Sequence, residues 1–239
     1  MSIIKLDAID STNDYLKQLA RENELDNFTI VTAFDQNKGR GQLNTKWCSE
    51  PGKNLTMSMF VNENSFVNHS VFDFNVTVAL AVIKVVEQLN IPNTNLKWPN
   101  DIMADGKKVG GILIENTFKP NGSFASVIGV GLNLNQTNFE NLPQATSLTC
   151  LTGNVYEIET LAHQIKKSLE LQLQTPIEEN WKNYLNILFK INVPCAFEDA
   201  HGQRFMGIIQ TVNREGKLAV LKDDDQICLY EVKEIKMLF

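Results

Sequence analysis

Apolar residues recur at helical spacing in two long segments, 73–89 and 157–174, at intervals of three and four residues. A third such segment follows Pro176. Proline is favoured in the first turn of a helix, so Pro176 marks its expected start. A fourth, shorter segment follows Ser11, which we expect to cap the helix and to form a capping box with Asp14. The pattern therefore predicts four helices.

Runs rich in β-branched and aromatic residues lie between these helices and predict strands. They cover residues 3–6, 28–34, 54–61, 96–98, 109–115 and 124–134. The pair Asp105-Gly106 is typical of a tight hairpin turn, so the strands on its two sides are expected to fold back on each other. Asn121-Gly122 predicts a second turn.

From about Val193 the pattern changes to short apolar runs separated by turn signals such as His201-Gly202. The runs are 193–197, 205–212, 218–221, 227–230 and 235–238, and five short strands in sequence predict a small closed β-barrel. We therefore expect an α+β fold. A mixed β-sheet flanked by helices would occupy residues 1–190, and a small C-terminal β-barrel domain would occupy residues 191–239.

Composition narrows the possible functions. The chain has 239 residues, 43% of them hydrophobic, and a net charge of −6, which argues against nucleic acid as the main partner. The four cysteines lie far apart with no CxxC pair, which is typical of a reduced, cytoplasmic protein. No apolar run is long enough to span a membrane, and the N-terminus does not read as a signal peptide.

The densest candidate chemistry lies in Lys97-Trp98-Pro99-Asn100-Asp101 and in the residues from Lys107 to Leu113. Folding back at the hairpin would bring Asn100, Asp101 and Lys108 together. A carboxylate and an amide can hold Mg²⁺, and a lysine can neutralise a phosphate. Gly110 and Gly111 would let a ligand approach the backbone closely. A surface hairpin with an ordinary polar turn explains the same residues equally well.

Two further stretches are candidates for a binding site. The polar loop 35–47 contains Gly39-Arg40-Gly41 but lacks the Gly-Lys-Ser/Thr ending of a phosphate-binding Walker loop, and it could be a solvated loop. The segment Gly129-Val130-Gly131-Leu132-Asn133 lacks the third glycine and the following helix of a dinucleotide fingerprint. By periodicity alone it is a strand with glycines where another backbone or a ligand passes close.

Taken together, four segments in the same order resemble the motifs of biotin protein ligases. They are Ser11-Thr12-Asn13, Gln36 with Gly39-Arg40-Gly41 and Trp47, the Lys-Trp-Pro-Asn-Asp stretch with Lys-Val-Gly-Gly-Ile-Leu, and Gly129 to Asn133. The similarity spans about residues 1 to 190, and the C-terminal barrel fits the small last domain of that family.

The resemblance implies a class II synthetase-like catalytic domain and a two-step reaction. Biotin and MgATP would give biotinyl-5′-AMP, and a lysine of a biotin carboxyl carrier protein domain would then take the biotinyl group. ATP, Mg²⁺ and biotin are the ligands this implies, with no tightly bound cofactor and no partner among nucleic acids or membranes. Some members of the family carry an N-terminal DNA-binding domain before the Ser-Thr-Asn segment. Here that segment begins at residue 11, so we expect the monofunctional type.

The resemblance also implies roles for particular residues. The biotin site would be formed by Ser11, Thr12, Asn13, Gln36, Arg40, Gly41, Gln42, Lys108, Gly110 and Gly111. The nucleotide site would be formed by Arg40, Trp47, Asn100, Lys108, Gly131 and Asn133. Lys108, Arg40 and Asp101 would carry the chemistry, and Asn100 and Asp101 would hold Mg²⁺.

Two positions depart from the family pattern. Relatives commonly read Gly-Arg-Gly-Arg with another basic residue three further on, whereas this chain has Gln42 and Thr45 there. The loop therefore loses two cations, and retention of the intermediate is the property most affected. Two alternative functions are compatible with the same sequence. One is a lipoate or octanoate ligase or transferase of the same fold, and the other is a biotin-sensing module without catalysis.

Overall fold

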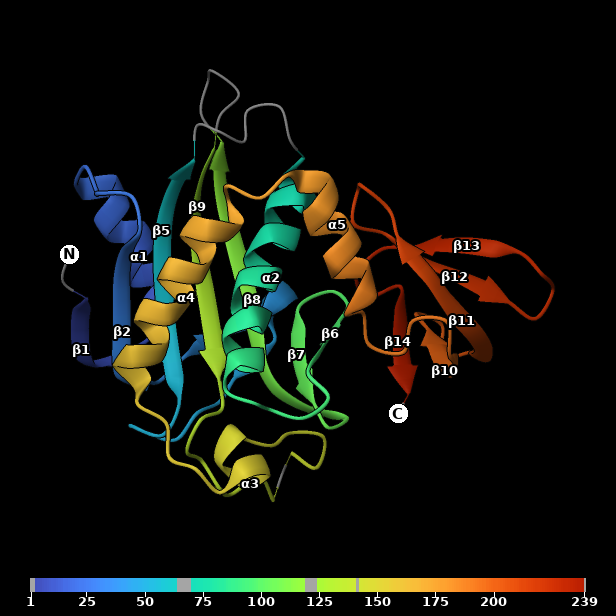
Figure 1. Ribbon diagram of the computed structural model, residues 1–239, viewed down its shortest axis with the longest axis horizontal. Coiled ribbons are helices and arrows are strands. Elements are labelled where there is room, and N and C mark those ends of the chain that lie inside the picture. The colour runs from blue at the N-terminus through green and yellow to red at the C-terminus, as the bar shows by residue number, and fades with distance from the viewer. Residues whose placement is uncertain (1–2, 64–69, 119–123, 141, 239) are drawn as a thin grey trace.

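A computed structural model describes residues 3–63, 70–118, 124–140 and 142–238 (Figure 1). The predicted turn at Asn121-Gly122 lies outside these residues.

The main sheet has seven strands in the order β1-β2-β5-β9-β8-β7-β6. Only β1 and β2 pair in parallel, and the remaining neighbours are antiparallel. The strands are β1 Ile4–Ile9, β2 Thr29–Gln36, β5 Leu55–Glu63, β6 Asn95–Lys97, β7 Asp101–Ala104, β8 Lys107–Phe118 and β9 Phe124–Leu132. The predicted α+β fold with a mixed sheet is confirmed.

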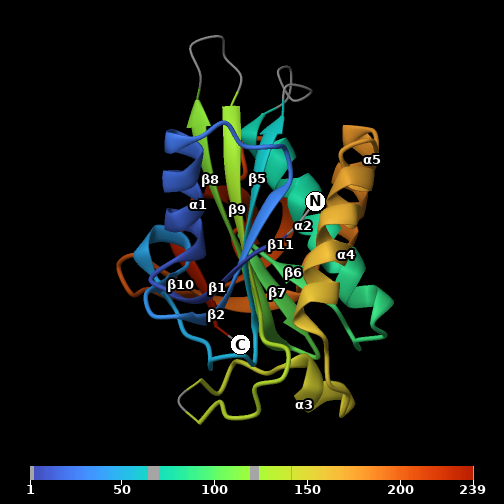
Figure 2. The same ribbon diagram turned by 90° about the vertical axis from the view of Figure 1, so that its left-hand side faces the viewer.

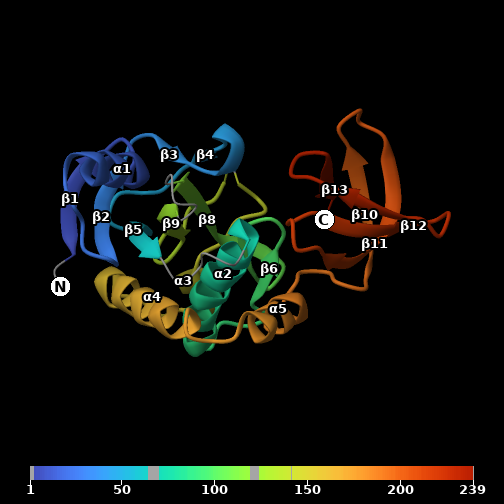
Figure 3. The same cartoon turned by 90° about the horizontal axis from the view of Figure 1, so that it is seen from above.

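Helices cover both faces of this sheet. Helix α1, Thr12–Glu22, lies on one face, and α2, α4 and α5 lie on the other (Figures 2 and 3). The bounds of these three are Val71–Gln88, Ile158–Gln172 and Ile177–Asn186, so all four predicted helices are confirmed. A short fifth helix, α3 at Leu148–Thr152, was not predicted, and it is capped by Ser147. None of the helices in the described part of the chain combines the length and apolar character that crossing a membrane requires.

Successive side chains of each strand point to opposite faces of the main sheet. One face packs against α2 and α4, and the other packs against α1. On β9, Ile128 and Val130 belong to the main apolar cluster with α2 and α4, whereas Val127 belongs to a smaller cluster under α1. Because successive residues of a strand point to opposite faces, Gly129 and Gly131 share the α1 face with Val127. The two glycines therefore make room on that face for side chains from the start of α1 and from the loop after β2.

The predicted cap of α1 is only partly right. Ser11 does accept a hydrogen bond from the backbone of Asp14, at 3.4 Å. The Asp14 carboxylate, however, pairs with Arg40 and Lys17, so it does not return to the Ser11 backbone as a capping box requires. A complete capping box is formed instead at α2, by Ser70 and Asp73.

The predicted hairpin is confirmed between β7 and β8. Asp105 and Gly106 form its two-residue connection with φ angles of 47° and 75°. Positive φ at both positions is the signature of a type I′ turn, whose twist matches that of paired strands. The pairing is interrupted by a bulge, because Ile102 faces Gly110 while Met103 faces Lys108. Val109 is therefore the extra residue.

The loop after β2 contains a two-stranded ribbon that the sequence did not predict. Strand β3, Gly39–Arg40, pairs with β4, Lys46–Trp47, and a 3₁₀ turn, η1 at Gln42–Asn44, joins them. A Cβ on Gly39 would lie 2.4 Å from the Trp47 carbonyl oxygen, so only glycine permits this close pairing. Figure 3 shows the ribbon on the same side of the sheet as α1.

All five predicted C-terminal strands are confirmed. They are β10 Pro194–Asp199, β11 Arg204–Val212, β12 Leu218–Lys222, β13 Ile227–Tyr230 and β14 Ile235–Leu238, and we call them the C-terminal sheet. Their order is β13-β12-β11-β10-β14, so β13 and β14 are its edges. β14 follows β13 in the chain, and the turn 231–234 carries it across to β10, with which it pairs.

A turn of the C-terminal sheet, residues 213–217, fastens it to the helices. Arg214 bonds the Asp73 carboxylate at 3.2 Å, and its guanidinium carbon lies 4.6 Å from the centre of the Trp181 ring. Trp98 donates its indole hydrogen to the Gly216 carbonyl at 2.9 Å. One apolar cluster continues from the helices into the C-terminal sheet, which fixes the sheet beside the hairpin.

Candidate active site

A cavity of about 340 Å³ is lined by residues from five separate parts of the chain and from the C-terminal sheet. The predicted site residues that line it are Ser11, Thr12, Asn13, Gln36, Arg40, Gly41, Gln42, Trp47, Asn100, Asp101, Lys108, Gly111 and Gly131. Two predicted residues, Gly110 and Asn133, do not line it.

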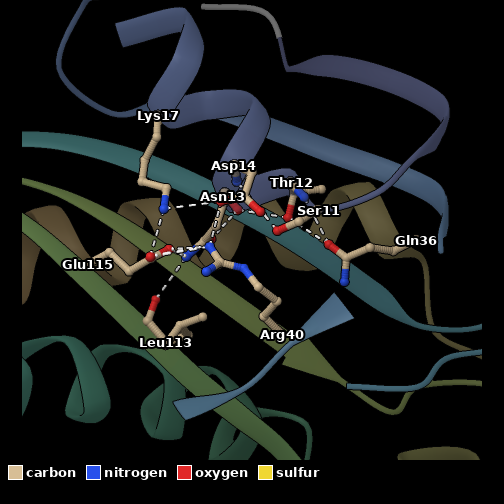
Figure 4. Close-up of polar contacts among 10 residues, drawn as sticks. Ser11, Thr12, Asn13, Asp14, Lys17, Gln36, Arg40, Leu113 and Glu115 are labelled. Atoms are coloured by element: carbon tan, nitrogen blue, oxygen red, sulfur yellow. Dashed lines mark hydrogen bonds and ion pairs between the residues drawn. The ribbon is translucent and has the colours of Figure 1, made fainter. Parts of the chain in front are cut away.

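The start of α1 forms a connected polar cluster against β2 and β5 (Figure 4). Thr12 donates from its backbone nitrogen and its hydroxyl to Gln36 Oε1, at 2.9 and 3.1 Å. Ser58 Oγ, fully buried on β5, lies 2.8 Å from Thr12 Oγ1 and 2.5 Å from Asn13 Oδ1. These mutual bonds fix the orientation of the polar atoms at this part of the cavity before any ligand binds.

Glu115, on β8, joins this cluster to the ribbon and was not found from the sequence. It accepts a hydrogen bond from Asn13 Nδ2 at 2.9 Å, and pairs with Lys17 at 2.7 Å and with Arg40 at 2.9 Å (Figure 4). Burial raises the pKa of Glu115, but the hydrogen bonds from Lys17 and Asn13 and the nearby charges outweigh it, so the pKa lies below its usual value. The carboxylate therefore stays ionised.

Arg40 ties the ribbon to the main sheet. Its Nη2 bonds Asp14 at 2.6 Å and Glu115 at 2.9 Å, from two different elements. Its Nε is buried without an acceptor among the described residues, and the same is true of Trp47 Nε1. Both residues line the cavity, and buried donors normally have partners. Two donors are thus available for a ligand that carries acceptor oxygens.

Two glycines of β9 make room for these side chains. A Cβ on Gly129 would lie 2.5 Å from Asn13 Oδ1, and one on Gly131 would lie 2.6 Å from Trp47 Cε2. The Trp47 ring therefore packs directly on the backbone of β9. Gly111 is opposite Gly131 in the neighbouring strand, and a Cβ there would make only ordinary contacts. The glycines of the motif serve side-chain packing as well as ligand access.

Lys108 and Asp101 meet across the hairpin, with Nζ 2.5 Å from Oδ1. The bulge at Val109 shifts the alternation of β8, so Lys108 shares the face of Gly111 and its Nζ lies 5.9 Å from the centre of the Trp47 ring. Lys97 approaches the other Asp101 oxygen at 3.6 Å. Burial lowers the pKa of Lys97, with Asp101 opposing the shift and Lys108 adding to it.

The proposed metal ligands do not fit a protein-built Mg²⁺ site. The Asp101 carboxylate lies between two lysines, which already balance its charge. Asn100 donates from its side-chain nitrogen to the Ile112 carbonyl at 2.7 Å. Only its side-chain oxygen is then left to bind a metal ion. Among the described residues no group of three or more His, Cys, Asp or Glu could hold a metal ion. We therefore derive no step through a metal bound by this chain.

The positions of Gly110 and Asn133 have structural explanations. Gly110 faces the core, where a Cβ would lie 2.4 Å from Leu132 Cδ2. Asn133 is buried and donates from its side chain to the Thr146 carbonyl at 3.0 Å. Its backbone nitrogen bonds the Val109 carbonyl at 2.7 Å, so Asn133 supports the bulge that orients Lys108.

Other lining residues were given no role by sequence reasoning, although some of them lie within the named motifs. They include Met57, Pro99, Ile112, Leu113, Val130, Val232 and Lys233. Glu115 could have been found from the sequence. It lies four residues after Gly111 on the same strand, and residues an even number apart on a strand point to the same face of the sheet. No local signal identifies Val232 and Lys233, since they reach the cavity from the far end of the chain.

Comparison with known proteins gives consistent matches. A sequence model of the biotin/lipoate A/B protein ligase family matches residues 6–133. The bifunctional ligase/repressor BirA of Bacillus spizizenii is 29% identical over 194 residues, covering 76% of this chain. The biotin–[acetyl-CoA-carboxylase] ligase of Mycobacterium tuberculosis is 29% identical over 222 residues, covering 88% of this chain. The chain spans 59% of the length of the first relative and 79% of the second.

The fold has solved counterparts. The structure of biotin protein ligase from Aquifex aeolicus in complex with biotin and ATP superposes with a TM-score of 0.80 at 24% identity. The match covers 99% of this chain and 98% of that chain, so both the main sheet and the C-terminal sheet have equivalents there.

Proposed function

The chain belongs to the biotin/lipoate A/B protein ligase family, and within it we propose that the chain activates biotin with ATP to biotinyl-5′-AMP and transfers the biotinyl group to one lysine of a biotin carboxyl carrier domain. One observation carries this proposal. Four short motifs, spread along the chain from Ser11 to Gly131, line a single cavity.

The polar cluster at the start of α1 suits the ureido ring of biotin, which presents two N–H donors and a carbonyl acceptor. Thr12, Asn13 and Gln36 offer hydroxyl and amide groups held by their own hydrogen bonds. Met57, Val130 and Leu113 give the cavity apolar surface for the thiophane ring and the acyl chain. Lipoate has no ureido group, so it could not make the additional hydrogen bonds that these polar groups offer a ligand, which disfavours its binding.

In the first step, the biotin carboxylate oxygen attacks the α-phosphorus of ATP. The bond from that phosphorus to the oxygen of the β-phosphate breaks, and pyrophosphate leaves. Lys108 is proposed to neutralise the carboxylate and the α-phosphate as these two anions approach. Asp101 positions the Lys108 ammonium group through the 2.5 Å contact.

The ribbon is proposed to cover the mixed anhydride. The free donors Arg40 Nε and Trp47 Nε1 suit oxygens of the carboxyl and phosphate groups, and they are already desolvated. Exclusion of water from this region would protect the anhydride from hydrolysis.

In the second step, the carrier lysine amine attacks the acyl carbon, an amide bond forms and AMP leaves, with the amine proton released to solvent. The lysine belongs to the carrier domain of a biotin-dependent carboxylase, in keeping with the name of the Mycobacterium tuberculosis relative. Cytoplasmic location is part of the same proposal, and the four cysteines are unpaired.

Biotin-dependent exchange of pyrophosphate into ATP tests the first step. We expect exchange with biotin and none with lipoate at the same concentration. Exchange that depends on lipoate would assign the chain to the other branch of the family. No exchange with either acid, despite tight binding of biotin, would favour a sensing module without catalysis.

A further inference from the structure

The turn between β13 and β14 brings two residues of the C-terminal sheet to the cavity. Val232 and Lys233 both line it, although they are about a hundred residues or more from every other lining residue in sequence. Lys233 has φ of 76°, a left-handed conformation that a lysine rarely adopts. The Lys233 side chain reaches the ribbon, where its Nζ donates a hydrogen bond to the Leu43 carbonyl at 2.9 Å.

The bond from Lys233 meets the ribbon at its tip. Leu43 is itself in the left-handed region, with φ of 51°, and its side chain is exposed. Within the described part of the chain, the other hydrogen bonds of the tip are internal, from Gly41 to Thr45 and from Thr45 to Gln42. The bond from Lys233 therefore connects the tip to the rest of the molecule, at the end of the ribbon opposite to the Arg40 anchor.

The four cations around the cavity divide into two pairs. Four cations line the cavity, and two of them, Arg40 and Lys108, are paired with carboxylates. Lys46 and Lys233 have no ion-pair partner among the described residues. The acids beside Lys233 are engaged elsewhere, since Glu231 pairs with Lys217 at 2.9 Å and Glu234 accepts from the Glu231 backbone at 2.7 Å.

The position of Lys233 is fixed by the attachment of the C-terminal sheet. Trp98, which bonds the turn 213–217, is next to Pro99 of the cavity wall. The same turn bonds the start of α2 through Arg214 and Asp73. Lys233 thus projects from a rigidly attached element and not from a free tail, so its charge stands at a defined place beside the cavity.

We propose that Lys233 is a positioning residue that latches the ribbon tip over the cavity and directs a positive charge at the phosphate of bound biotinyl-AMP. This inference rests on the proposed function and extends it, because it makes the C-terminal sheet responsible for how long the intermediate is held. The charge matters more here because the tip residues Gln42 and Thr45 are neutral.

The test measures release of ready-made biotinyl-AMP from the full chain and from three variants. Lys233→Met keeps the length of the side chain without its charge, Lys233→Arg keeps the charge, and Lys182→Met is a matched control on the exposed surface of α5. We expect Lys233→Met to release the adenylate roughly tenfold faster, as for loss of one charged hydrogen bond. Biotin alone should bind with nearly unchanged affinity, and the other two variants should resemble the wild type.

Ionic strength provides a second readout. Salt should accelerate release from the wild type more than from Lys233→Met, because only the former uses this charge. If the wild type catalyses pyrophosphate exchange but releases the adenylate at the same rate and with the same salt dependence as Lys233→Met, the latch is overturned. The proposed function is then left intact. Absence of exchange in the wild type would instead overturn the proposed function. Faster release that Lys233→Arg does not restore would also count against the role of charge.

Discussion

Lys108 owes its position to three separate features. The hairpin turn sets the pairing of β7 with β8, the bulge at Val109 turns the side chain to the cavity, and Asp101 holds the ammonium group. The side chain remains 35% exposed, so a ligand in the cavity can reach it. A charge that is fixed before the reaction needs no reorganisation in the transition state, which is the condition for electrostatic catalysis.

We therefore predict that Lys108→Ala slows formation of biotinyl-AMP by roughly 10²- to 10³-fold, the usual loss for one preorganised charged donor. The measurement is single-turnover adenylate formation at saturating biotin and ATP. Lys107→Ala is the matched control, because this neighbour on the same hairpin is exposed and does not line the cavity. Near-normal rates for Lys108→Ala would remove the residue from the mechanism.

At the scale of elements, the ribbon is anchored by few contacts. Arg40 holds one end and Lys233 the other, and Leu43 at the tip is exposed. Segments with few buried apolar contacts open at low free energy. Ligand contacts with Arg40 and Trp47 would add to these anchors and shift the equilibrium toward the closed ribbon.

We expect trypsin to cleave the free protein after Arg40 or Lys46, and biotin with ATP to suppress that cleavage by about tenfold or more. Lipoate with ATP serves as the control for nonspecific stabilisation. Cleavage rates that are the same with and without biotin would show that binding does not order the ribbon. Mass spectrometry of the fragments identifies the sites.

The sequence predicted elements better than it predicted contacts. Four helices and all five C-terminal strands follow from periodicity, and the resemblance to biotin protein ligases is confirmed by the family match. Most predicted site residues line one cavity because the motifs occupy strand ends and turns with clear local signals. Gly110 was included with Gly111 although alternation places them on opposite faces.

Long-range contacts were beyond local reasoning. The ion pairs of Glu115 join residues 75 and 98 positions apart, and Lys233 reaches Leu43 from 190 positions away. The order of the C-terminal strands was also beyond local reasoning, since β14 follows β13 in the chain but pairs with β10. The division at residue 190 stays a prediction, and the apolar cluster is continuous across it.

At the scale of the whole molecule, Asp73 connects the helices to the C-terminal sheet. Its carboxylate accepts from the Trp181 indole at 2.6 Å, from the Ser70 backbone at 2.8 Å and from Arg214 at 3.2 Å. Burial raises the pKa of Asp73, but these hydrogen bonds outweigh it, so the pKa lies below its usual value. The ionised carboxylate is therefore stabilised in the folded state and joins α2, α5 and the C-terminal sheet.

We predict that Asp73→Asn lowers the free energy of unfolding at neutral pH by about 1–3 kcal/mol, the range for hydrogen bonds to a charged group. The folded pKa is below the unfolded value of about 3.9, so this contribution is present above that value and is lost as the pH falls through the folded pKa. Urea unfolding of wild type and variant should therefore converge at acid pH. A constant difference down to the lowest pH would contradict the assignment.

The intact mass of a biotin carboxyl carrier domain, incubated with this protein, biotin and ATP, tests the central claim most directly. The account predicts a gain of one biotinyl group on a single carrier lysine, dependent on ATP and strongly reduced with Lys108→Ala. An unmodified carrier, or a carrier that gains a lipoyl group when lipoate is supplied and no biotinyl group, would contradict it.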